Sequence, residues 1–236
     1  MTYKEFRERS PHLPFMSASL ASNMCYPMSP FISMFCIKHK ISPNTITFLM
    51  ILLGAIGGII LMIPNTWCKL LAAIIYYLWY TFDLSDGEVA RMTKTFSKGG
   101  KYLDWCAHLV CHPLFIIGMY MSFYSLDYCS SYFLYITFFL ICVELINRNV
   151  TAITELYNVK EGISSVQNEK LGVVRYIWSV LFYFPDLVIL FPFFLAIDMF
   201  FQWNIVYYVY FIWAVIYCLN VTRGFITFVL KMYKSE

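Results

Sequence analysis

Residues 83–108 read DLSDGEVARMTKTFSKGGKYLDWCAH and place a charged stretch between two long apolar segments. Asp83 and Asp86 come at the end of the first apolar segment. Asp104 and His108 come at the start of the second. Ionisable side chains at a membrane-spanning segment are costly, so a cluster of them is by default a hypothesis about function. We therefore expect two helix ends to face one short loop and to bring these side chains together.

The composition around this stretch is that of a membrane protein. The chain has 236 residues, of which 60% are hydrophobic and 13% are charged. A typical soluble domain carries about 25% charged residues, so this chain has too few to cover a soluble globule. The composition excludes a soluble enzyme and a disordered chain. The net charge of +3, without a Lys/Arg-rich run, gives no indication of nucleic-acid binding.

Six segments approach the length of about 20 mostly apolar residues that a transmembrane helix needs. The predicted spans are 45–63, 70–90, 102–124, 132–147, 176–200 and 205–230. With both termini cytoplasmic, all of the 17 Lys and Arg residues except Lys69 lie on the inner side, in accord with the positive-inside rule. The sequence thus predicts an all-α integral membrane protein with six transmembrane helices over residues 45–230. It also places the charged stretch at the cytoplasmic face.

The first 44 residues are predicted to lie along the inner leaflet as an interfacial helix. The apolar run 13–37 is interrupted by Asn23, Pro27 and Pro30, which disfavours a membrane span. A span there would also move the basic residues near the N-terminus to the outer side. The whole chain, residues 1–236, is interpreted as a single membrane domain.

Helical spacing sharpens the interpretation of the charged stretch. Asp83 and Asp86 are three residues apart and share a helix face, as do Asp104, His108 and His112 at intervals of four. Carboxylates that converge from two helices repel one another unless a cation lies between them. Oxygen ligands of this kind favour magnesium, manganese or calcium. His112, one turn deeper, is interpreted as a packed histidine.

The complete pattern is Asp83-x2-Asp86-Gly87-x2-Ala90-Arg91-x8-Gly100-x3-Asp104-x3-His108. It resembles the signature of the CDP-alcohol phosphotransferase family, D-x2-D-G-x2-A-R-x8-G-x3-D-x3-D, at every position but the last. The six-span layout and residues 42–47, which open the first span, also resemble that family.

The resemblance implies transfer of a substituted phosphate from a CDP-alcohol onto an acceptor hydroxyl, with release of CMP. It implies a divalent cation, Mg²⁺ or Mn²⁺, held by Asp83, Asp86 and Asp104, with His108 as a further ligand or as the base. Asp104 and His108 are the candidate catalytic residues. The substrate-binding residues that it implies are Asn44, Thr47, Gly87, Ala90, Arg91 and Gly100. Members of the family are commonly homodimers in the lipid bilayer.

His108 stands where the family has its fourth aspartate, and three interpretations are open. His108 acts as base or metal ligand in an active variant. Alternatively, the protein is active and another group takes the proton. In the third interpretation the protein has lost catalysis and binds nucleotide or acts as a scaffold.

The donor is either CDP-diacylglycerol or a small CDP-alcohol, and the acceptor alcohol is left open. Arg148 and Arg175 are candidates for binding an acceptor phosphate, or else are positive-inside anchors. Glu144 is a further candidate for an acceptor contact. Asp186, which follows Pro185, either faces a cavity or caps the helical segment that the proline restarts.

Two other function classes are weighed against the transferase. A catalytically silent relative predicts nucleotide binding without CMP release. A transporter or channel is disfavoured, because the acidic residues cluster at one membrane face and not at the midplane, where transporter sites usually lie.

Overall fold

The fold was analysed in a computed structural model, which describes residues 1–10, 19–97, 99–125, 131–160 and 173–233. These residues form helices and connecting turns, so the predicted all-α class is confirmed for them. The helices are α1 Tyr3–Arg9, α2 Leu20–Cys25, α3 Ser29–Lys38, α4 Pro43–Met62, α5 Thr66–Thr93, α6 Gly100–Tyr124, α7 Ser131–Lys160, α8 Val173–Phe182, α9 Phe184–Phe201 and α10 Val206–Tyr233.

Five of these helices are long and apolar enough to cross a membrane: α4, α6, α7, α9 and α10. The chain is therefore an integral membrane protein by length and composition of its helices. α5 has 28 residues, which is also long enough, but it is less apolar because it holds Lys69, Asp83 and Asp86. The predicted count of six spans depends on α5 and stays a prediction.

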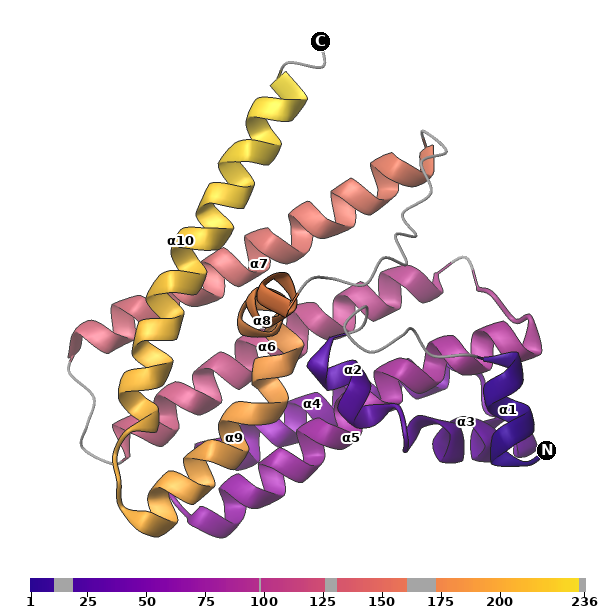
Figure 1. Ribbon diagram of the computed structural model, residues 1–236, viewed down its shortest axis with the longest axis horizontal. Helices are drawn as coiled ribbons and strands as arrows, with labels where there is room; N and C mark the ends of the chain where they lie inside the picture. The colour runs from indigo at the N-terminus through magenta and orange to yellow at the C-terminus, as the bar shows by residue number, and fades with distance from the viewer. Residues whose placement is uncertain (11–18, 98, 126–130, 161–172, 234–236) are drawn as a thin grey trace.

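At the centre of the bundle, α4 packs along both α5 and α6 (Figure 1). α9 packs against α5, α7 packs against α6, and α10 packs against α7. Small residues let α4 and α6 approach closely. A Cβ atom on Gly118 would lie 2.9 Å from the carbonyl oxygen of Gly58, and one on Gly54 would overlap the Cys111 side chain. Such close approach is typical of membrane helix pairs.

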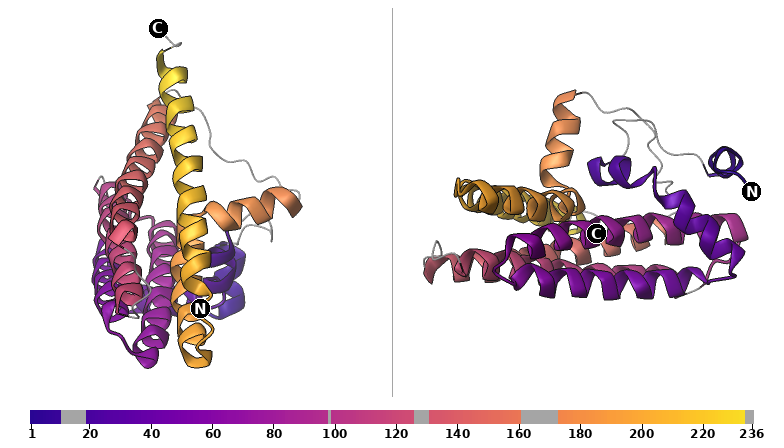
Figure 2. Two further views of the ribbon diagram at one scale, coloured as in Figure 1. Left: turned by 90° about the vertical axis from the view of Figure 1, so that its left-hand side faces the viewer. Right: turned by 90° about the horizontal axis from the view of Figure 1, so that it is seen from below.

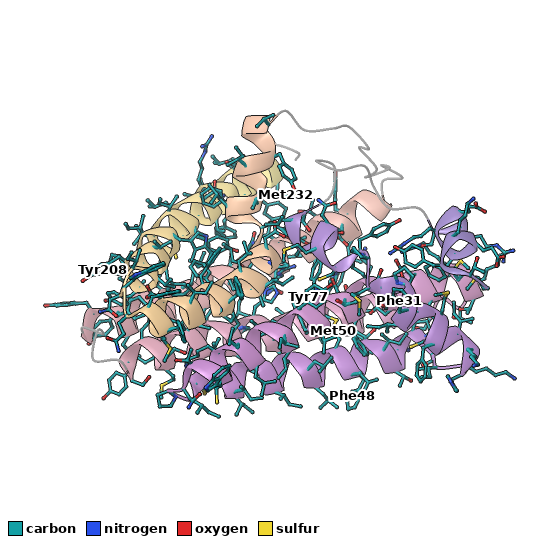
Figure 3. The ribbon with its side chains drawn as sticks, turned by 60° about the horizontal axis from the view of Figure 1, so that its bottom comes forward. Phe31, Phe48, Met50, Tyr77, Tyr208 and Met232 are labelled. Carbon is teal, nitrogen blue, oxygen red and sulfur yellow. The ribbon has the colours of Figure 1, made fainter. Side chains whose placement is uncertain are left out.

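The outward surface of the bundle is apolar. Figure 3 shows Phe48 pointing away from the bundle, whereas Met50, two residues further along α4, lies inside it. Phe48 is 54% exposed and Met50 is fully buried. Exposed phenylalanine, leucine and isoleucine side chains also lie along α7 and α10. Contiguous exposed apolar surface of this kind indicates contact with lipid or with another protein.

The predicted fifth span, 176–200, is not one helix. The structure divides it into α8 and α9 at Tyr183, and α8 turns away from the bundle (Figure 2). The cause is Pro185, which lies in the first turn of α9 and has no backbone N–H to continue a helix from α8. Pro192, inside α9, does not break the helix.

Two other sequence-based boundaries differ from the structure. The fourth span was predicted to end at Asn147, but α7 continues to Lys160, because residues 148–160 contain no proline or glycine that would end the helix. The N-terminal segment was predicted as one interfacial helix, but it contains three short helices, α1 to α3. α1 and α3 lie at the end of the bundle where α5 ends, whereas α2 packs against the middle of α5 and against α9 (Figure 1).

Asp186 links the N-terminal segment to the bundle. Its carboxylate accepts hydrogen bonds from the backbone N–H groups of Leu20, at 3.1 Å, and Ala21, at 2.7 Å. It lies in the first turn of α9 and is buried. Of the two predicted roles, capping agrees better with these contacts, but the helix that Asp186 caps is α2 and not α9, to which it belongs.

Candidate active site

The signature residues lie on two helix ends joined by a short loop, as predicted. α5 ends at Thr93, and Lys94 closes it in the left-handed conformation, with a φ of 55°. α6 begins at Gly100, whose N–H donates to the carbonyl oxygen of Ser97 at 3.2 Å. The loop thus reverses the chain and places the last turns of α5 beside the first turns of α6.

A candidate metal site forms where the two helices face each other. Asp83, Asp104 and His108 each offer one ligand atom, and these three atoms lie within 4.8 Å of one another. The Nε2 atom of His108 is 3.5 Å from Oδ1 of Asp83 and 3.6 Å from Oδ1 of Asp104. Oδ1 of Asp104 is buried and has no hydrogen-bond partner among the described residues.

These residues fit a divalent cation on chemical grounds. Two carboxylates and an imidazole nitrogen converge, and one carboxylate oxygen is buried without a protein donor. A buried oxygen without a partner is costly, and a cation would satisfy it. Carboxylate oxygens suit magnesium and manganese. The structure therefore supports Asp83, Asp104 and His108 as ligands.

Asp86, the fourth predicted ligand, is not part of this three-residue group. Its Oδ2 atom accepts a hydrogen bond of 2.6 Å from the hydroxyl of Thr47 on α4. Thr47 is a predicted substrate-binding residue, so the structure joins two predicted site residues from separate helices.

One pocket gathers the predicted substrate-binding residues of α4, α5 and α6. Its volume is about 290 Å³. Its lining includes Asn44, Thr47, Asp86, Gly87, Ala90, Arg91, Gly100 and Asp104. We call it the signature pocket. A Cβ atom on Gly87 would lie 3.0 Å from Nη1 of Arg91, so the glycine leaves room for this guanidinium to fold back beside the helix.

A second pocket, of about 280 Å³, is bordered by all three residues of the candidate metal site. We call it the α6–α7 pocket. It is lined by Asp83, Asp104 and His108 together with Trp105, Leu109, Arg148, Asn149, Thr151, Ala152, Glu155 and Tyr183. Asp104 lines both pockets. The candidate metal site therefore lies at the boundary between them.

Arg148 lies in the α6–α7 pocket, but part of its guanidinium is already engaged. Its Nε donates to Oε1 of Glu144 at 2.9 Å. Arg175, the other predicted phosphate-binding residue, belongs to α8, and its side chain lies outside the described residues. Glu144, predicted as an acceptor contact, is fully buried and is not among the residues that line the α6–α7 pocket.

Sequence reasoning missed how Glu144 is connected to the site. Oε1 of Glu144 lies 2.6 Å from Nδ1 of His112, and its Oε2 accepts a hydrogen bond from the hydroxyl of Tyr217. The interval of four between His108 and His112 was the available signal for the α6 part. No signal pointed to Tyr217, which comes from α10, or to Tyr183 between α8 and α9.

The fold and the site together define an integral membrane protein with an Asp-Asp-His cluster between two pockets at one end of a helical bundle. The family described as CDP-alcohol phosphatidyltransferase matches residues 40–219. The match covers well over half of the chain, and the chain therefore belongs to that family of membrane phosphotransferases. No match was found among curated proteins.

Proposed function

We propose that the protein transfers a substituted phosphate from a CDP-alcohol to an acceptor hydroxyl and releases CMP. The acceptor oxygen attacks the phosphorus that carries the alcohol. A new P–O bond forms, and the bond between that phosphorus and the bridging oxygen breaks, so that the bridging oxygen leaves with CMP. The hydroxyl proton passes to a base of the protein.

One observation carries this proposal: Asp104 lines both the signature pocket and the α6–α7 pocket. A transfer between two substrates needs both to meet at the reacting phosphorus, because positioning supplies much of the rate of phosphoryl transfer. We assign the CDP-alcohol to the signature pocket and the acceptor to the α6–α7 pocket. The reacting phosphorus would then lie beside Asp83, Asp104 and His108.

The residues take separate roles in this assignment. Asn44, Thr47 and Arg91 orient the cytidine and diphosphate groups. Asp83, Asp86, Asp104 and His108 would hold the Mg²⁺ or Mn²⁺ ion, which supplies charge neutralisation for the diphosphate and the leaving CMP. The hydroxyl proton passes either to Asp104 or to His108, the latter only if His108 does not ligate the ion, since both border the acceptor pocket.

The test is CMP release by the purified protein in lipid nanodiscs. CDP-diacylglycerol, CDP-choline and CDP-ethanolamine would each be offered with Mg²⁺ or Mn²⁺ and a panel of acceptor alcohols. We expect release from one donor class, dependent on the cation. Asp104→Asn is expected to lower the rate about 100-fold or more, because it removes a charged group between both substrates.

The matched control is Glu8→Gln, an acid-to-amide change at an exposed position of α1. It is expected to keep the wild-type rate. CDP-alcohol binding without CMP release would favour the catalytically silent relative. Neither binding nor release across the panel would contradict the proposed function.

A further inference from the structure

A line of buried polar side chains runs from the metal cluster into the core of the bundle. Nδ1 of His108 lies 3.2 Å from Nε2 of His112, and Nδ1 of His112 lies 2.6 Å from Oε1 of Glu144. Glu144 is 0% exposed and His112 is 1% exposed. The line therefore joins α6 to α7 in a region closed to solvent.

The charges along this line are balanced when His112 is neutral, with hydrogen on only one of its two ring nitrogens. Glu144 accepts hydrogen bonds from Nε of Arg148 and from the hydroxyl of Tyr217, in addition to its contact with His112. An ionised carboxylate, which only accepts, satisfies all of these contacts. Arg148 already neutralises it, so a positive charge on His112 would be buried without a counter-charge, which is costly.

The polarity of each hydrogen bond then follows. Because Glu144 only accepts, the shared hydrogen lies on Nδ1 of His112. A neutral His112 has a bare Nε2 atom, which accepts from an N–H at Nδ1 of His108. In its neutral form His108 then carries no hydrogen on Nε2, the atom that faces Asp83 at 3.5 Å and Asp104 at 3.6 Å.

Packing holds both rings in these orientations. His112 stacks on Phe184 with ring centroids 4.5 Å apart and an interplanar angle of 27°. The ring of Trp79 meets His108 edge-on at 5.6 Å and His112 at 5.8 Å. A flip of either ring would have to displace these neighbours.

We propose that His112 and Glu144 are positioning residues that set the tautomer of His108, so that its Nε2 atom offers a lone pair to the Asp83–Asp104 cluster. The inference deepens the proposed function, on which it rests. A hydrogen bond from the far nitrogen of a ligating histidine to a carboxylate is a common way to fix ring and tautomer. Here the carboxylate acts through a second histidine.

The proposal explains how a histidine serves where the family signature has an aspartate. With the opposite tautomer, Nε2 would carry a hydrogen and donate it to Asp83 or Asp104. It could then neither ligate a cation nor accept a proton.

The test reads the tautomer directly, in protein without metal or substrate. The chain has only 4 histidines, so a sample labelled with ¹⁵N-histidine in nanodiscs gives few ring signals to assign by NMR. Spectra recorded over a series of pH values separate neutral rings from charged ones, and we expect neutral His108 to show hydrogen on Nδ1 and a bare Nε2. A neutral wild-type His108 with hydrogen on Nε2 would overturn the proposal, whatever the variants do.

Two substitutions test the role of His112. His112→Phe keeps a ring against Phe184 but removes the acceptor, and is expected to release His108 into a mixture of tautomers. It should weaken Mn²⁺ binding, followed by electron paramagnetic resonance, about tenfold or more. His112→Gln returns a carbonyl oxygen as acceptor and should restore the tautomer, with Mn²⁺ affinity close to that of wild type.

An unchanged tautomer and an unchanged Mn²⁺ affinity in a folded His112→Phe protein would contradict the proposal. Thermal unfolding of each variant verifies folding, and if His112→Phe does not fold, the wild-type spectrum still decides. The measurement is independent of CMP release. The expected tautomer in a protein without transfer activity would support this inference and count against the proposed function.

Discussion

Asp83 and Asp86 are three residues apart on α5, yet the structure gives them different partners. Asp83 belongs to the cluster with Asp104 and His108. Asp86 instead accepts a hydrogen bond of 2.6 Å from Thr47 and faces the signature pocket. The two carboxylates are therefore held by different helices, and the orientation of Asp86 depends on α4.

This difference makes Thr47 a test of how the signature pocket is held. Thr47→Val keeps the shape of the side chain but removes the hydroxyl, and Asp86 loses its donor. A hydrogen bond to a charged group contributes about 1.5–3 kcal/mol, so we expect kcat/KM for the CDP-alcohol to fall about tenfold or more. Thr47→Ser retains the hydroxyl and should stay near wild type in the same CMP-release assay. Equal rates for the two variants would contradict this role.

At the residue scale, the sequence predicted what is close along the chain. The intervals between Asp83, Asp86, Asp104 and His108 were enough to predict that these residues come together, because the residues lie on two helix ends joined by one short loop. The contact of His112 with Glu144 joins residues 32 apart on α6 and α7. No helical interval encodes it, since it depends on how the two helices pack.

At the scale of elements, α1 is held against α5, the helix that carries Asp83 and Asp86. Arg7 forms an ion pair of 2.8 Å with Glu88 of α5, and its guanidinium lies over the ring of Tyr26 at 3.3 Å. Glu88 also accepts hydrogen bonds from Ser29 at 2.9 Å and Ser33 at 2.6 Å. Glu88 follows Gly87 in the signature, so the N-terminal helices support α5 directly beside the site.

Removal of Arg7 should destabilise the protein because it leaves the Glu88 charge buried. Breaking one side of a buried ion pair costs about 3–5 kcal/mol, and we expect Arg7→Met to approach this loss in the free energy of unfolding. The double variant Arg7→Met, Glu88→Gln should recover much of the loss, since no lone charge remains. Reversible unfolding in mixed micelles measures these values.

Arg9→Met is the matched control for this cycle, because Arg9 lies on the same helix and is exposed. It should change stability little. A double variant that is no more stable than Arg7→Met would show that the ion pair itself is not what fastens α1 to α5.

Element boundaries followed the sequence only where apolar character and helix formation coincide. α4 and α6 begin and end within two residues of their predicted spans, because Pro43 and Gly100 mark their starts. α7 continues past its apolar part to Lys160, since helix propensity does not require apolar residues. α8 and α9 separate at Tyr183, where backbone geometry before Pro185 overrides a continuous apolar pattern.

At the scale of the whole molecule, the connections decide how many times the chain crosses the bilayer. α4 ends at Met62 and α5 begins at Thr66, so only residues 63–65 join them. α5 packs along α4 and α9, both of which are apolar. A helix that turns back so sharply and lies beside two apolar helices has to return through the same membrane. This argument favours six crossings over five, although α5 is less apolar than its neighbours.

The number of crossings determines where the two termini lie, which makes it measurable. Six crossings place both termini on one side, and five would place them on opposite sides. The basic residues favour the cytoplasmic side for both, because only Lys69, in the first turn of α5, lies toward the outer side. It is buried there and donates to Leu61 and Ser122. We expect green fluorescent protein to fluoresce when fused to either end of the full chain in a bacterial inner membrane, and alkaline phosphatase at the same ends to be inactive. Active phosphatase at one end alone would indicate five crossings, and at both ends an inverted protein whose candidate site faces away from cytosolic nucleotide.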